Sequence, residues 1–231
     1  GDKVTYIGST FMKYGDKEPY KNHCVVLNDC DKILDGKTEI VECKTEKDLL
    51  VKWTKMIQEE NPDIIIGYNI FGFDYEFLFQ RSLENKCHYE FLQLSRNIDE
   101  PCFETTNNGE VKIEESKIVL ASGEHNLKFI KMNGRVQIDL YNYFRRDFNL
   151  PSYKLDYVAS YFISDDVIDV KHVKLGERYY TDIYTKNMTG LYVGSFINFE
   201  ESSHSTEYYK DGAKFEIVKI NKNKKCFNSK S

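Results

Sequence analysis

The residues best able to carry chemistry gather at one turn in the first third of the chain. Asn69 and Asp74 follow the run Asp63–Ile66, which Pro62 and Gly67 bound. A short, nearly unbroken apolar run of this kind predicts a strand buried on both faces. Open α/β sheets place their functional sites at the carboxyl ends of such strands. The sequence therefore predicts a site in which an amide and a carboxylate stand together at the end of one strand.

Asp74 also has a plain structural interpretation. It would lie in the first turn of the helix that follows, where the helix dipole favours an acid. For an arbitrary Asp at such a place, this interpretation would be preferred. Gly67, Asn69 and Phe73 favour a functional role instead, because together they demand a particular turn rather than any cap.

Other polar patterns have good structural explanations. Asp139 closes a predicted strand, and a helix-capping role explains it at least as well as a catalytic one, so its replacement should cost stability rather than activity. Residues 141–146 mix rings with basic groups in the style of a single-strand groove, but an amphipathic helix with two solvated arginines is the default. The five histidines form no spacing that suggests a site; they are His23, His88, His125, His172 and His204.

Local patterns also predict the helices that flank this turn. Thr45 opens a helix, with Asp48 three residues later in the place of a capping-box acid. Apolar residues then recur at helical spacing until Asn61-Pro62 stops the helix. A second helix is predicted from Phe73 onward. These helices enclose the apolar run, so we expect an element of parallel sheet between them.

Predicted strands lie on both sides of this region. The first three suggest an antiparallel meander, and Asn133-Gly134 predicts a hairpin turn. Residues 84–115, between the second predicted helix and the later strands, are polar and weakly patterned, so we expect a long excursion of the chain there. The predicted strands are Val4–Tyr14, His23–Asn28, Glu39–Cys43, Asp63–Ile66, Lys117–Ala121, Leu127–Met132 and Arg135–Leu140, and the later helices are Tyr141–Phe148 and Lys154–Phe162.

Composition excludes several classes of protein. The 231 residues are 41% hydrophobic and 30% charged, which suits a soluble globular protein. No apolar run approaches the roughly 20 residues of a membrane span. The net charge of −5 leaves no basic surface to coat nucleic acid, so such contact would need a local groove or a metal. Six cysteines without a Cys-x-x-Cys pair indicate free thiols in a reducing compartment.

Several segments, in order, resemble the proofreading domain of the family B DNA polymerases. The run Gly67-Tyr-Asn-Ile, with Phe73-Asp74 behind it, resembles the family's second exonuclease motif. Residues 4–11 look like the second strand of that domain, and residues 134–140 and 151–159 like its later strand and helix. Most of residues 1–185 matches in order, and the composition, rich in Asn, Lys, Tyr and Ile, resembles that of polymerases of large DNA viruses. The resemblance implies a ribonuclease H-like α/β fold with a mixed sheet and flanking helices.

The resemblance also implies a metal-dependent chemistry. Family exonucleases use four carboxylates to hold two divalent metals, Mg²⁺ or Mn²⁺, which activate a water and stabilise the leaving oxygen. Asp74 would be a catalytic metal ligand, while Asn69 would contact the substrate nucleotide and Phe73 would pack against it. The remaining acids should lie outside this chain. Asp74-Tyr-Glu76 and Tyr143…Asp147 imitate the other motifs, but neither stands in the family order.

We interpret the chain as a fragment of such a polymerase, acting in DNA replication. Residues 1–185 would form a partial 3′→5′ exonuclease domain and residues 186–231 a small β-rich insertion. The strand Asp63–Ile66 should be central in the sheet, with an exposed edge left by a missing first strand; a position at the sheet's edge would count against the family. A stand-alone ribonuclease H-like exonuclease and an inactive single-strand-binding module are the alternatives.

Partners and location follow from the same resemblance. The implied partners are the single-stranded primer 3′ end of DNA and, for the parent enzyme, deoxynucleotides, with a sliding clamp as a further candidate and no membrane. The implied location is an intracellular reducing compartment, either the nucleus or a cytoplasmic viral replication site.

Overall fold

The computed structural model describes residues 2–16, 18–31, 33, 38–120, 123–175, 178–188, 191–202, 206–221 and 226–230. It contains two compact units, residues 1–155 and residues 156–231. The predicted domain boundary at 185/186 remains a prediction. The strands on either side of it are described below with the second unit. Within the described residues, no helix is both long and apolar enough to span a bilayer.

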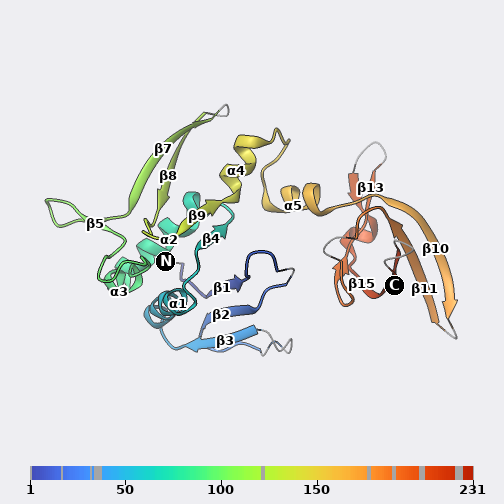
Figure 1. Ribbon diagram of the computed structural model, residues 1–231, viewed down its shortest axis with the longest axis horizontal. Helices are drawn as coiled ribbons and strands as arrows, with labels where there is room; N and C mark the ends of the chain where they lie inside the picture. The colour runs from blue at the N-terminus through green and yellow to red at the C-terminus, as the bar shows by residue number, and fades with distance from the viewer. Residues whose placement is uncertain are drawn as a thin grey trace. The chain divides into compact units, whose positions relative to one another are not determined.

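The first unit opens with a three-stranded sheet covered by one helix (Figure 1). Strand β1 pairs antiparallel with β2, but β2 pairs parallel with β3, so the predicted antiparallel meander is wrong. A tight hairpin joins only antiparallel strands, whereas the ten residues between β2 and β3, which can span ~33 Å when extended, exceed the length of the seven-residue β2 and can return the chain to the same end of the sheet. These elements are β1 (Tyr6–Phe11), β2 (Lys21–Leu27), β3 (Thr38–Cys43) and α1 (Glu46–Glu60).

Helix α1 begins as the capping pattern predicts. The Thr45 hydroxyl accepts the backbone N–H of Asp48 at 3.1 Å, and Asn61 ends the helix in a left-handed conformation. One face of the helix is buried in the core of the unit, with Leu49, Leu50 and Trp53 among its buried residues. The predicted start, end and buried face of this helix are therefore confirmed.

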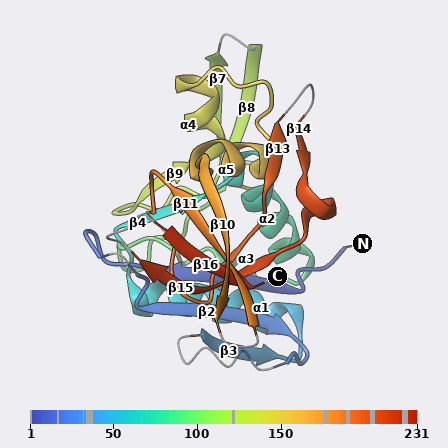
Figure 2. The ribbon, with the colours of Figure 1, turned by 90° about the vertical axis from the view of Figure 1, so that its right-hand side faces the viewer.

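The rest of the first unit surrounds a short parallel pair of strands, β4 and β9. A long antiparallel hairpin, β7 with β8, projects away from the body of this unit (Figure 2). Ala121, the predicted end of β7, lies outside the described residues. The elements are β4 (Ile64–Gly67), a π-helical turn (Ile70–Asp74), α2 (Tyr75–Glu84), α3 (His88–Phe91), β5 (Glu104–Thr105), β6 (Val111–Lys112), β7 (Glu114–Leu120), β8 (Gly123–Phe129), β9 (Val136–Asp139) and α4 (Leu140–Asp147).

Strand β4 is not central, which corrects the prediction for this strand. Among the described residues it pairs with β9 alone, and Ile64 and Ile66 on one face are 48% and 58% exposed. Ile65 on the other face packs against the core. The strand therefore has an open edge, as we expected for the sheet, but only one of its faces packs against the core, and that face is half-buried.

Two further predictions about this unit are wrong. Asn133-Gly134 does not join a hairpin, because β9 pairs with β4 and β8 pairs with β7. Residues 84–115 are not a loose excursion, because Phe91, Leu92 and Leu94 are completely buried in the core. The predicted helix at 141–148 is confirmed as α4.

The second unit is mostly antiparallel sheet. Its five-stranded sheet has the order β10-β11-β16-β15-β12, and its small core contains Ile183, Ile217 and Phe227. The predicted helix at 154–162 is confirmed as α5. The elements are α5 (Leu155–Ile163), β10 (Val167–Leu175), β11 (Arg178–Thr185), β12 (Phe196–Ile197), β13 (Glu200–Ser202), β14 (Thr206–Tyr208), a 3₁₀ turn (Tyr209–Gly212), β15 (Phe215–Asn221) and β16 (Cys226–Lys230).

All six cysteines lie in the described part of the chain and are free thiols. Cys43, Cys87, Cys102 and Cys226 are buried. Burial raises the pKa of Cys87 to about 11, because an apolar environment disfavours the thiolate. This agrees with the prediction of unpaired, partly buried thiols.

Candidate metal and nucleic-acid site

The site is built where β4 and β9 end side by side (Figure 1). The two strands run parallel with Gly67 opposite Asp139, so the turn after β4 and the start of α4 meet at one edge. The carboxyl ends of parallel strands are the usual place for functional side chains in α/β folds. The structure therefore brings Asn69 and Asp74 to the place that the sequence predicts, and it adds Asp139 from the neighbouring strand.

The turn after β4 has an unusual backbone. Asn69 is left-handed, with φ 61° and ψ 25°, and its carbonyl accepts the N–H groups of Gly72 and Phe73 at 3.1 and 3.0 Å. Asparagine is one of the few non-glycine residues that adopt this conformation readily. The chain then makes one π-helical turn before α2 begins. Such turns occur often at functional sites.

The two glycines of the motif are required by close contacts. A Cβ atom added at Gly67 would lie 2.4 Å from Ile70 Cγ2. A Cβ atom added at Gly72 would lie 2.3 Å from Oδ1 of Asn69. Real Cβ atoms do not approach other atoms so closely, so any larger residue at Gly72 would displace the Asn69 amide. The spacing of the motif thus leaves room for the Asn69 side chain in its present position.

Asp139 holds this turn from the neighbouring strand. Its side chain is buried, at 4% exposure, and accepts four hydrogen bonds. Oδ1 accepts from the backbone N–H of Asn69 at 2.7 Å and of Tyr141 at 3.0 Å. Oδ2 accepts from the backbone N–H of Phe71 at 3.0 Å and from Asn142 Nδ2 at 3.1 Å. The predicted capping role is confirmed by Tyr141, but two of the four donors belong to the turn.

Asp74 itself is presented to solvent. Its side chain is exposed, and it makes no capping hydrogen bond to α2, although it stands directly before that helix. Among the described residues, no basic side chain pairs with its carboxylate. The chain packed around it nevertheless raises the pKa of Asp74 by removing water, and the Asp139 carboxylate raises it further, while its own N–H lowers it. A carboxylate oxygen in this environment is a donor that suits a hard divalent ion.

Phe73 provides an apolar surface next to that carboxylate. The ring is 60% exposed and stacks on Phe77, with ring centres 5.7 Å apart and planes 7° from parallel. A large exposed ring of this kind can pack against a nucleotide base or sugar. The structure thus places Asn69, Phe73 and Asp74, the three predicted site residues, on one turn.

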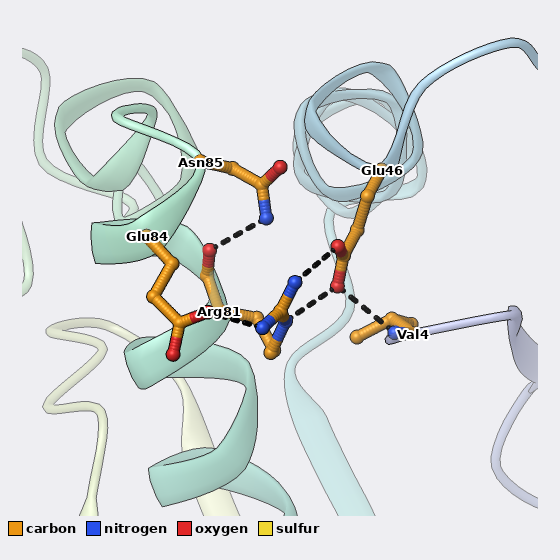
Figure 3. Close-up of polar contacts among 5 residues, drawn as sticks. All are labelled: Val4, Glu46, Arg81, Glu84 and Asn85. Atoms are coloured by element: carbon orange, nitrogen blue, oxygen red, sulfur yellow. Dashed lines mark hydrogen bonds and ion pairs between the residues drawn. The ribbon is translucent and has the colours of Figure 1, made fainter. Parts of the chain in front are cut away.

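Helix α2, which Asp74 precedes, is joined to α1 by a buried ion pair (Figure 3). Arg81 donates from Nε and Nη2 to the two Glu46 oxygens at 2.8 and 2.6 Å, and Glu46 Oε1 also accepts the Val4 N–H at 2.9 Å. Arg81 also pairs with the more exposed Glu84. The site therefore rests on a helix whose position is set by charged groups in the core. The sequence offered no local signal for this contact, since the two partners lie 35 residues apart.

The acids of the two segments that resemble the other exonuclease motifs, Glu76 and Asp147, form ion pairs with basic side chains. Glu76 pairs with Lys128 at 2.5 Å, and Asp147 pairs with Arg146 at 2.8 Å. In residues 141–146, Arg145 and Arg146 lie over the rings of Tyr141 and Tyr143. No group of three or more His, Cys, Asp or Glu side chains within the described ranges is arranged to hold a metal ion. Any metal at Asp74 would therefore need ligands beyond those described.

Comparison with known proteins identifies the family. The model for "DNA polymerase family B, exonuclease domain" matches residues 1–158. The chain is 48% identical over 229 residues to a DNA polymerase of Phaeocystis pouchetii virus, covering 96% of this chain and 22% of that protein. It is 37% identical to a DNA polymerase of Pyramimonas orientalis virus, covering 87% of this chain and 15% of that protein.

The similarity extends to cellular proteins. The chain is 30% identical to the DNA polymerase delta catalytic subunit of Glycine max, covering 83% of this chain and 16% of that protein. The chain thus spans about a fifth or less of the length of these relatives. The resemblance drawn from the motif at 67–74 is confirmed, since that motif lies within the matched residues. The chain belongs to DNA polymerase family B, and its residues 1–158 belong to the exonuclease domain of that family.

Proposed function

We propose that this chain supplies part of a 3′→5′ proofreading exonuclease to a polymerase of the length of its relatives. The observation that carries the proposal is the exposed Asp74 carboxylate, which has no basic partner among the described residues and stands at the meeting ends of two parallel strands. The proposed core is ribonuclease H-like. Its substrate would be the single-stranded primer 3′ end of DNA, and the parent enzyme would also use deoxynucleotides.

Asp74 would hold a divalent cation, Mg²⁺ or Mn²⁺, in a two-metal site that carboxylates outside this chain complete. When bound, such cations activate water and stabilise the leaving oxygen of a phosphodiester. The chain's own residues would orient the strand that is cut. Asn69 would donate or accept a hydrogen bond at the terminal nucleotide, and the Phe73 ring would pack against it. The free thiols support a reducing compartment, either the nucleus or a cytoplasmic viral replication site.

The test uses the polymerase that carries this chain. Asp74→Ala should slow single-turnover removal of a mismatched primer end by roughly 10²–10³-fold, which is the usual cost of losing an electrostatic stabiliser of a transition state. Primer extension by the same preparation should change little, because the residues of the polymerase active site would lie outside this chain. Asp147→Ala is the control, since Asp147 is an exposed acid paired with Arg146.

Two results would decide against this function. Excision at wild-type speed by the Asp74 variant would remove Asp74 from the metal site, whereas no excision even by the wild-type polymerase would favour an inactive single-strand-binding module. A slower primer extension that matches the loss of excision would show general damage to the enzyme rather than a separate editing site.

A further inference from the structure

The Asp139 carboxylate has more hydrogen bonds than a helix cap requires. One bond to a backbone N–H of the first turn caps a helix, and Asn or Ser would serve as well. Asp139 makes that bond to Tyr141 and three others, although burial of a carboxylate is costly. No Lys or Arg pairs with it in the described part of the chain. Its two oxygens have about four acceptor positions, and four N–H groups occupy them. Asp139 therefore has no position left for a cation.

The two bonds beyond the first helical turn both reach the turn that carries the site. Asn69 N–H and Phe71 N–H come from residues 70 and 68 positions away in the sequence. These bonds lie on either side of Ile70, at the start of the π-helical turn that ends at Asp74. Asn69 has the left-handed backbone, which is unfavourable for most L-residues. The carboxylate of Asp139 stabilises the backbone where it is least favourable.

We propose that Asp139 is a positioning residue for the exonuclease site. It fixes the turn 69–74 against the end of β9, so that Asp74 and Phe73 keep one orientation toward the substrate and its cation. The proposal rests on the function proposed for Asp74. It replaces our expectation that loss of Asp139 would cost stability alone.

Asp139→Asn separates positioning from capping. Asparagine has nearly the same shape and is as good a helix cap as aspartate. It has one acceptor oxygen and one NH₂ donor, however, and the oxygens of Asp139 each face a backbone N–H of the turn. In either orientation of the amide, the NH₂ group would oppose the N–H of Asn69 or of Phe71. A residue that only caps α4 would tolerate the change, whereas one that holds the turn would not.

The experiment compares variants of the polymerase that carries this chain. Asp139→Asn should slow single-turnover excision by roughly 10²-fold, which is the usual cost of displacing a reacting group by about 1 Å. Primer extension should be unchanged. Asp147→Asn is the matched control, because it makes the same acid-to-amide change at the exposed end of the same helix. In the wild-type protein, amide hydrogen exchange should show Asn69 and Phe71 as well protected as strand β9, and Asp139→Asn should speed their exchange. This second readout needs neither metal nor substrate.

The outcomes separate the two proposals. Slow excision by Asp74→Ala together with normal excision by Asp139→Asn would overturn the positioning role and leave the proposed function standing. Normal excision by Asp74→Ala would overturn the proposed function. Should Asp139→Asn fail to fold, the wild-type exchange decides: N–H groups of Asn69 and Phe71 that exchange as fast as those of an open loop would overturn the positioning role.

Discussion

Replacing Glu46 with Gln tests whether the buried ion pair fixes the helix that carries the site. The Arg81 guanidinium, followed by the Val4 N–H, lowers the pKa of Glu46 to about 2 against an ordinary value of 4.5. A pKa difference of about 2.5, at 1.36 kcal/mol per unit, corresponds to about 3 kcal/mol of stability. Glu46→Gln should lower the free energy of unfolding by about this amount at pH 7, because it leaves Arg81 buried without its main counter-charge.

The sign of the pH dependence makes the prediction sharper. Since the folded pKa of Glu46 is below the unfolded one, its stabilisation is fully present above pH 4.5 and disappears as the pH falls toward 2. The difference between wild type and Glu46→Gln should therefore shrink over that same interval. Urea titrations followed by fluorescence measure it, because Trp53 is the chain's single tryptophan and is buried in α1.

Glu84→Gln is the matched control for this prediction. Glu84 pairs with the same arginine but its side chain is 63% exposed, against 5% for Glu46. An exposed ion pair contributes about 0–1 kcal/mol. Equal losses in the two variants, or a Glu46→Gln loss that stays constant between pH 5 and pH 2.5, would refute the view that burial makes this pair important.

Two further predictions concern the site. Gly72→Ala should slow excision by roughly 10²-fold with little effect on primer extension, because the added Cβ would meet Oδ1 of Asn69. Gly8→Ala is its control, because a Cβ atom added there would meet no atom within 4 Å, and equal excision by the two variants would contradict the packing argument. Calorimetric titration of the 231-residue chain with Mn²⁺ should show no tight stoichiometric binding, since hard ions need several oxygens held together; a tight site would mean that an acid treated as inert is a ligand.

Features set by neighbouring residues could be predicted from the sequence. The Thr45 cap involves residues three positions apart, and the stop at Asn61-Pro62 is local. The predicted start and end of α1 are therefore both confirmed. The motif at 67–74 is also local: Gly67 makes room for the side chain of Ile70 and Gly72 for that of Asn69, each three residues away. Its three predicted site residues therefore lie together in the structure.

Strand pairing could not be predicted in the same way. β3 could lie in either direction beside β2, and the length of their connection permits both. Asn133-Gly134 favours a hairpin locally, but β9 gains a partner in β4, some 70 residues earlier. The run Asp63–Ile66 indicates an apolar strand without revealing how many strands cover it. The expectation that an edge position would count against the family was wrong, since β4 has an open edge and the chain belongs to the family.

The contacts that hold the site show why its geometry needs more than the motif. β4 and β9 are four residues each, and so short a parallel pair has little stability of its own. Buried charged residues fix it at both ends. Arg135 donates to Asn61 Oδ1 and the Pro62 carbonyl before β4 begins, and Asp139 accepts from the turn after β4 ends.

Both of these residues lie at the ends of β9, where Arg135 directly precedes the strand and Asp139 is its last residue, and this strand carries no residue of the motif at 67–74. The sequence indicates a metal-binding role for Asp74, but only a cap for Asp139 and no role for Arg135, because the partners of these two residues are near in space and far apart in sequence. If short paired strands place the metal ligand, then the residues at the ends of β9 should determine its orientation as much as the motif does. Variants of Asp139 would then impair editing while leaving every predicted site residue in place.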